Sequence, residues 1–205
     1  MALFFDLDGT LIDSKLRLFN LFKYLVPNSE LNFEEYWELK KQKKSHKNIL
    51  TSLYDYSEKN LITFEQKWMP LIEDKAYLKL DEPFTGVTEY LQQLNKDNLS
   101  IYIVTARQNK DIALKQINSF GWGDLIKAVL VTEQKDNKEN LIVPFLEIDK
   151  TNWIIGDTDS DIKVGKKLGI STVAVLTGFQ GLEILKSSNP DFLLNSVLEF
   201  APNSI

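Results

Sequence analysis

From Leu80 onward, short apolar runs alternate with segments of helical spacing. The runs, each rich in Ile and Val, are Ser100–Thr105, Ala128–Val131, Trp153–Gly156 and Thr172–Leu176, and the opening run Ala2–Leu7 is similar. Such runs are typical of strands buried on both faces of a sheet. The helical segments are Val87–Leu94, Asn109–Phe120, Leu141–Ile148 and Asp159–Leu168. This alternation predicts an α/β fold, a doubly wound parallel sheet with a Rossmann-like core.

Residues 14–79 break the alternation. Apolar side chains such as Leu18 and Leu21 recur there at helical spacing, and no run typical of a strand is present. We therefore predict an all-helical cap at residues 14–79, inserted between the first and second core strands. The α/β core would then consist of residues 1–13 and 80–205.

The chain has 205 residues, no cysteine and a single histidine, His46. Thiol catalysis, disulfides and cysteine-ligated zinc are therefore excluded, as is a histidine-rich metal site. Any bound metal must be held mainly by oxygen, which suits hard cations such as magnesium. His46 lies within the basic run Lys40–Lys47, which we interpret as a solvated helix face that leaves the histidine exposed.

The formal net charge is −5, with 24 basic and 29 acidic residues. This balance argues against nucleic-acid binding, which needs a basic surface, but leaves open small anionic substrates. No stretch approaches the ~18–20 consecutive apolar residues of a membrane span, and the N-terminus lacks the pattern of a secretory signal. We therefore expect a cytoplasmic protein with no nucleic-acid or membrane partner. Nothing in the sequence indicates a protein partner.

Three polar elements follow predicted strands, at the carboxyl ends where parallel α/β sheets place their ligand sites. They are DLDGT at residues 6–10, TAR at residues 105–107 and GDTDSD at residues 156–161. Acidic side chains that converge there repel one another, and a divalent cation usually compensates. We predict a magnesium site in which one carboxylate is free to act as a nucleophile. Taken singly, Asp159 or Asp161 is better explained as a helix cap.

The segments DLDGTLID, IVTAR, a downstream lysine and IIGDTDSDI occur in this order and closely resemble the motifs of the haloacid dehalogenase superfamily. The chain looks most like the phosphoglycolate phosphatase-like branch, which has a helical cap after the first motif. The resemblance runs nearly the whole length of the chain. It implies a magnesium-dependent phosphatase that hydrolyses a small phosphorylated metabolite through an aspartyl-phosphate, with phosphoglycolate as a candidate substrate.

On this resemblance, Asp6 is the nucleophile that forms the aspartyl-phosphate. Asp8 is the general acid that protonates the leaving oxygen and then the base that activates water. Gly9 permits the chain to bend after the strand, so that the two carboxylates come close. The dehalogenases lack this second aspartate, because a halide leaves without a proton. The presence of Asp8 therefore points to phosphoryl transfer.

The resemblance also implies binding roles. Magnesium would be held by Asp6, the main-chain carbonyl of Asp8, and Asp157. Asp161 would support that site directly or through water. The residues expected to contact the phosphoryl group or the substrate are Gly9, Thr10, Thr105, Ala106 and Arg107.

The family has a lysine that neutralises the nucleophile and the phosphate. The segment TEQKDNKENLI offers Lys135 and Lys138, and both lie closer to Asp157 than is usual in this branch. We prefer Lys138, because it immediately precedes the apolar helical run that starts at Leu141.

Two other functions are considered. A phosphomutase would share these motifs but return the phosphate to a sugar instead of to water. A non-catalytic binding protein could use the same fold as a scaffold. Such a protein should lose the acidic motif residues, and all of them are present here.

Overall fold

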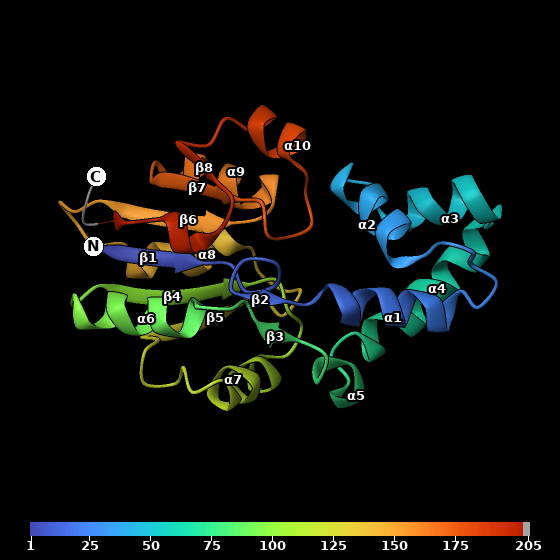
Figure 1. The fold of residues 1–205 in the computed structure, drawn as a ribbon, viewed down its shortest axis with the longest axis horizontal. Helices are drawn as coiled ribbons and strands as arrows, with labels where there is room; N and C mark the ends of the chain where they lie inside the picture. Colours follow the sequence, from blue (N-terminus) through green and yellow to red (C-terminus); the bar gives the residue numbers. More distant parts are fainter. Residues whose placement is uncertain (203–205) are drawn as a thin grey trace.

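A parallel six-stranded sheet forms the core of the computed structural model, which describes residues 1–202 (Figure 1). The strands, in sheet order, are β5 (Ala128–Val131), β4 (Ser100–Thr105), β1 (Ala2–Phe5), β6 (Asn152–Gly156), β7 (Ser171–Val175) and β8 (Phe192–Leu194). The predicted doubly wound α/β core is confirmed. Because β1 lies between β4 and β6, the strand order reverses beside it, which is where such sheets bind ligands.

Helices cover both faces of the sheet. They are α6 (Val87–Lys96), α7 (Lys110–Ser119), α8 (Lys138–Ile142), α9 (Asp159–Leu168) and α10 (Leu182–Ser187), with 3-10 turns at Val143–Phe145 and Val197–Glu199. The side chains of β1 alternate between the faces. Leu3 and Phe5 join the apolar cluster under α6 and α7, whereas Ala2 and Phe4 join the one under α8 and α9. Both faces of β1 are buried, as its continuous apolar run predicts.

The helix after β5 differs from the prediction of residues 141–148. It starts three residues earlier, at Lys138, because the Asn137 side chain accepts a hydrogen bond from the Asn140 amide at 2.9 Å and caps its first turn. After Ile142 the chain tightens into a 3-10 turn that contains Pro144, which has no amide proton to donate. Lys138 is therefore the first residue of the helix.

Five helices lie between the first and second core strands and pack into a separate body at one end of the sheet (Figure 1). They are α1 (Lys15–Leu25), α2 (Phe33–Lys41), α3 (His46–Tyr54), α4 (Glu58–Leu71) and α5 (Lys75–Leu78). We call these helices the cap. They have an apolar cluster of their own, built around Leu21, Phe22, Tyr36 and Leu50. Within residues 1–202, no helix is long and apolar enough to cross a membrane.

The two links between cap and core pair with each other. Strand β2 (Ile12–Asp13) leads into α1, strand β3 (Glu82–Pro83) follows α5, and the two run antiparallel. These two-residue strands are not among those expected from the sequence. Their pairing holds the entry and the exit of the cap side by side, so both links meet the core at the same place.

The prediction of an exposed His46 on a helix face is wrong. The run Lys40–Lys47 spans the end of α2 and the start of α3, because Ser45 caps a new helix there. The imidazole of His46 packs against Trp68 with ring centroids 4.1 Å apart, and its Nε2 lies 2.7 Å from the Tyr36 hydroxyl. The ring is therefore part of the aromatic cluster of the cap.

Candidate active site

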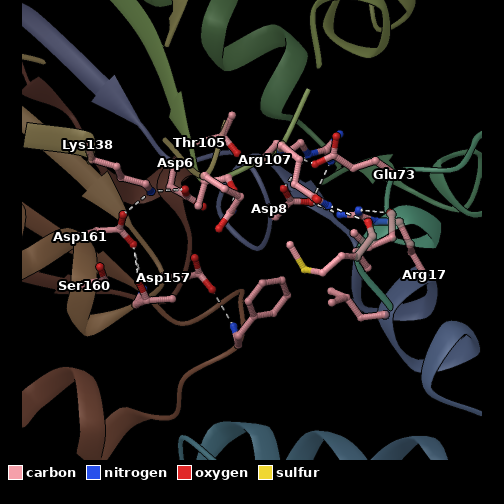
Figure 2. Close-up of a pocket in the computed structure, with 18 of the residues that line it drawn as sticks. Asp6, Asp8, Arg17, Glu73, Thr105, Arg107, Lys138, Asp157, Ser160 and Asp161 are labelled. Carbon is pink, nitrogen blue, oxygen red and sulfur yellow. Dashed lines mark hydrogen bonds and ion pairs between the residues drawn. The ribbon is translucent and has the colours of Figure 1, made fainter. Parts of the chain in front are cut away.

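The carboxyl ends of β1, β4 and β6 lie at one edge of the sheet. Phe5, the last residue of β1, pairs with Ile103 on one side and Ile155 on the other. Asp6, Thr105 and Asp157 therefore emerge beside one another. They line a cavity of about 330 Å³ together with Asp8, Ala106, Arg107, Lys138 and Asp161. The structure thus brings most of the expected site residues together, as Figure 2 shows.

Lys138 reaches the centre of this carboxylate group. Its ammonium donates to Asp6 and, at 2.7 Å, to Oδ1 of Asp161 (Figure 2). Burial alone would lower the pKa of Lys138, but the Asp161 and Asp6 carboxylates raise it above its ordinary value. Lys135, the alternative considered from the sequence, is exposed in the preceding turn and does not line the cavity. Of the two lysines, only Lys138 is in contact with Asp6.

The carboxylates carry more negative charge than Lys138 offsets. Burial raises the pKa of Asp6 to about 7; Lys138 opposes that rise, and Asp161 adds to it. Burial also raises the pKa of Asp157 well above its usual range, helped by the charges of Asp6 and Asp161. A group of this kind binds a proton readily, and it would bind a cation for the same reason.

A main-chain amide and a hydroxyl group bind the Asp157 carboxylate, and two glycines lie close to it. Its Oδ2 accepts a hydrogen bond from the Phe179 amide at 2.7 Å, and the Thr10 hydroxyl donates to its Oδ1 at 3.3 Å. A Cβ atom on Gly178 would lie 1.9 Å from Oδ2, and one on Gly9 would lie 2.5 Å from it. Gly9 and Thr10, which we expected to contact the phosphate, lie beside Asp157 and are not among the residues that line the cavity.

Asp161 has a structural task besides its contact with Lys138. Its Oδ2 accepts from the Thr158 hydroxyl at 2.6 Å, in a capping box that begins helix α9. Because Lys138 holds its other oxygen, both oxygens already have protein donors. Asp161 is therefore better placed to support a cation indirectly, through a group that ligates the cation, than to ligate it directly.

Asp8 lies between two arginines, one from the core and one from the cap. Arg107 donates from Nε to Oδ2 and from Nη2 to Oδ1, each at 2.8 Å. Arg17 of helix α1 also donates to Oδ1. Asp81, in the link that leads to β3, joins the two arginines by accepting from Arg17 Nε at 2.8 Å and from Arg107 Nη2 at 3.1 Å. The four side chains form a buried network of zero net charge, which we call the arginine–aspartate quartet.

The quartet fixes the ionisation of Asp8. Burial by itself would raise the pKa of Asp8, but the guanidinium groups of Arg107 and Arg17 lower it far below its usual range. In this arrangement Asp8 is a carboxylate at neutral pH. Such a group can accept a proton from water directly, but it must first gain a proton before it can act as an acid.

Arg17 and Asp81 are site residues that the sequence motifs do not include. For Arg17 a signal was present, because it lies in the first turn of α1, where the helix dipole disfavours a positive charge. A cation in that position suggests a specific anionic partner. Asp81 gives no comparable signal, since one acidic residue in a linker is usually exposed. Its side chain is in fact 0% exposed.

Further contacts close the cap over the site. The Glu73 carboxylate accepts from the amides of Gln108 and Asn109, at 2.6 and 3.1 Å, just after the TAR motif. On the other side, Phe179 of the core stacks on Trp37 of helix α2, with ring centroids 5.3 Å apart. Because the Phe179 amide also binds Asp157, this loop links the cap to the acidic group.

The donor set fits a magnesium ion in its chemistry. Asp6 and Asp157 are oxygen donors that lie close together with unbalanced negative charge, which is what a hard cation requires. Within residues 1–202, however, no three acidic or imidazole side chains are arranged as a ready-made cation cage. A main-chain carbonyl such as that of Asp8, or water, would have to complete the coordination.

Known proteins of one family are similar to this chain in sequence and in fold. A model of the haloacid dehalogenase-like hydrolases matches residues 3–175. Pyrophosphatase PpaX of Halalkalibacterium halodurans is 26% identical over 94% of this chain and 91% of that protein. Phosphoglycolate phosphatase of Aquifex aeolicus is 28% identical, covering 95% and 92%. In fold, the chain is similar to a haloacid dehalogenase-like hydrolase from Streptococcus pneumoniae, with a TM-score of 0.79, 22% identity and coverage of 97% and 95%.

Proposed function

Because this chain belongs to the haloacid dehalogenase-like hydrolase family and is a phosphatase of that family, we propose that it hydrolyses a small phosphomonoester with the help of magnesium, through an aspartyl-phosphate on Asp6. The observation that carries the proposal is the contact of Lys138 with Asp6 inside the cavity that Thr105 and Asp157 also line. The buried carboxylate of Asp6 can act as a nucleophile, and the ammonium group of Lys138 beside it can bind the phosphoryl oxygens.

In the first step, a carboxylate oxygen of Asp6 attacks phosphorus, and the bond from phosphorus to the ester oxygen breaks. The leaving oxygen takes a proton from Asp8. Thr105 and the amide of Ala106 would bind the transferring group from the end of β4, while Lys138 offsets its charge. Because Arg107 and Arg17 hold Asp8 ionised in this conformation, Asp8 must take up a proton before it can give one to the leaving oxygen.

In the second step, water attacks phosphorus of the aspartyl-phosphate, and the bond to Asp6 breaks to release inorganic phosphate. Asp8 accepts a proton from that water, a task for which the ionised state is suited. Magnesium, held by Asp6, Asp157 and the carbonyl of Asp8, would offset the negative charge of the carboxylates and the phosphoryl oxygens. The cap contacts through Glu73 and Phe179 would keep bulk water out.

The experiment is phosphate release from p-nitrophenyl phosphate and a panel of phosphomonoesters, with magnesium and with EDTA. We expect release that depends on magnesium and is abolished in Asp6→Asn. The matched control is Asp111→Asn, which makes the same change at an exposed position on α7 and should leave the rate unchanged. Substantial turnover by Asp6→Asn would overturn the assignment of the nucleophile. Isomerisation of a hexose 1-phosphate without phosphate release would favour a phosphomutase.

The substrates named for the relatives are pyrophosphate and phosphoglycolate. Both release an anionic leaving group, a phosphate in the first case and a glycolate in the second. Both belong in the panel beside neutral esters of similar size, so that hydrolysis with an anionic leaving group is compared directly with hydrolysis with a neutral one.

A further inference from the structure

The cavity has two unlike walls. Core residues, mostly charged or polar, line the side where the phosphoryl group would bind. The side provided by the cap is largely apolar, and Phe179 of the core extends it. The apolar residues of this wall are Leu18, Trp68, Met69 and Ile72. The leaving group of a bound ester must face this wall, because the phosphoryl group faces Asp6.

Two charged cap residues, Arg17 and Glu73, also line the cavity. Figure 2 shows them on the opposite side from Lys138 and Asp161. Arg17 is the only cation that the cap contributes to the described lining of the cavity. Whether the wall can bind an anion therefore depends on whether Arg17 or its neighbour Arg107 is free to do so.

Neither arginine is free. Arg17 donates from Nε to Asp81, from Nη1 to the carbonyl of Ile72 and from Nη2 to Asp8. Arg107 uses all three of its nitrogens in the same way, on Asp8, Asp81 and Gln116. Both side chains are only 4% exposed. The two positive charges are already balanced within the arginine–aspartate quartet.

The charge that is left on the cap wall is negative. The Glu73 carboxylate is held in place by two main-chain amides, and the cation on which its charge acts, Arg107, is already paired with Asp8 and Asp81. A carboxylate or phosphate leaving group beside it would lose water without gaining a counter-charge. Burial of a charge without a counter-charge is unfavourable, whereas a neutral group with apolar atoms would be stabilised by contact with the same wall.

We propose, on the basis of the phosphatase function above, that the substrate is a phosphomonoester whose leaving group is neutral and partly apolar. The leaving group is a compact alcohol or phenol that fits a cavity of about 330 Å³. On this proposal, Met69 and Ile72 determine specificity by direct contact. Phosphoglycolate and pyrophosphate are poor substrates, because each places a negative charge on the apolar wall.

The test compares matched esters with the wild-type protein. The pairs are 2-hydroxyethyl phosphate with 2-phosphoglycolate, and phenyl phosphate with 4-carboxyphenyl phosphate; pyrophosphate is added as a third anion. We expect kcat/KM to be at least about tenfold higher for the neutral member of each pair. Equal or higher kcat/KM for the anionic members overturns this inference but leaves the phosphatase function standing. No hydrolysis of any ester overturns both.

A variant tests the wall itself. Met69→Lys introduces a cation next to the leaving group, and Met69→Leu is the matched change without charge. We expect Met69→Lys to raise the ratio of kcat/KM for 2-phosphoglycolate over 2-hydroxyethyl phosphate about tenfold. Ile62→Lys, at a 53% exposed position of the same helix, should leave the ratio unchanged. If folded Met69→Lys leaves the ratio unchanged, then the leaving group does not bind against this wall. Should Met69→Lys not fold, Leu18→Lys provides the same test.

Discussion

Arg17, on the first helix of the cap, forms an ion pair with Asp8, on the core loop that follows β1. The same guanidinium donates at 2.8 Å to Asp81, in the link through which the chain returns to the core. The cap is therefore connected to the candidate active site through charge as well as through its two chain links. Any displacement of α1 would change the partners of Asp8.

Breaking this network should be costly, because Asp81 has no access to water. We expect Arg17→Gln to lower the free energy of unfolding by about 3–5 kcal/mol, since a buried carboxylate loses a charged donor. Asp81→Asn should also destabilise the protein. The double variant should lose less than the two single losses together, with a coupling energy of at least about 1 kcal/mol. Urea denaturation of the four proteins measures these values.

The control is an ion pair at the surface. Lys167 lies 3.2 Å from Glu139, and its side chain is 67% exposed. Lys167→Gln should change the free energy of unfolding by less than about 1 kcal/mol, because solvent screens such a pair. Additive losses at Arg17 and Asp81 would show that the quartet does not act as a unit.

Lys138 and Lys135 provide a matched pair within one short segment. Lys138→Met should lower kcat by about 10²–10³, because the phosphoryl group loses a buried charged donor next to Asp6. Lys135→Met makes the same change at an exposed position and should leave kcat near the wild-type value. Steady-state kinetics on p-nitrophenyl phosphate distinguishes the two. Comparable losses in both variants would contradict the role proposed for Lys138.

Local sequence patterns predicted the core well. The expected strands at Ser100–Thr105 and Ala128–Val131 and the expected helix at Asp159–Leu168 have the same bounds in the structure. Apolar runs buried on both faces mark the strands, and a capping box marks the start of that helix. In each case the determining interactions lie within a few residues, so the sequence alone is informative.

The rest depends on contacts between distant segments. Arg17 and Asp81 are 64 positions apart, and neither belongs to a motif. Phe179 contacts Asp157 through its amide, which any residue other than proline could provide. The basic neighbours of His46 in the sequence predict an exposed position, whereas its neighbours in space are aromatic. Only the tertiary packing of the chain reveals such partners.

Gly178 leaves no room for a side chain beside Asp157. A Cβ atom there would lie 1.9 Å from Asp157 Oδ2, so Gly178→Ala must displace the loop or the carboxylate. We expect kcat to fall at least about tenfold, and the free energy of unfolding to fall by about 1–3 kcal/mol from overpacking. Kinetics and urea denaturation measure the two effects.

Gly169, at the end of helix α9, is the control for Gly178. It has a φ of +66°, and a Cβ atom there would have no neighbouring atom within 4 Å, so Gly169→Ala introduces backbone strain without crowding. We expect a loss of about 1 kcal/mol in stability and no change in kcat. If Gly178→Ala behaves like Gly169→Ala, then the close approach to Asp157 does not matter for activity.

His46 should make the stability of the protein depend on pH. Burial in the cap lowers the pKa of its imidazole to about 3, with the charge of Lys40 as a second cause. Between about pH 6.5 and pH 3 the unfolded chain binds a proton that the folded chain does not. The stabilisation is therefore complete above about pH 6.5 and is lost as the pH falls, by at most about 1.4 kcal/mol per pH unit.

The variant His46→Gln isolates this effect. It should be less stable than the wild type at about pH 8, because the aromatic cluster loses a ring. As the pH falls toward about 4, its free energy of unfolding should decrease less steeply than that of the wild type, so the two curves converge. Carboxylates titrate in both proteins and cancel in the difference. Urea denaturation between about pH 4 and pH 8 measures both curves, and parallel curves would show that His46 is protonated as readily in the folded protein as in the unfolded chain.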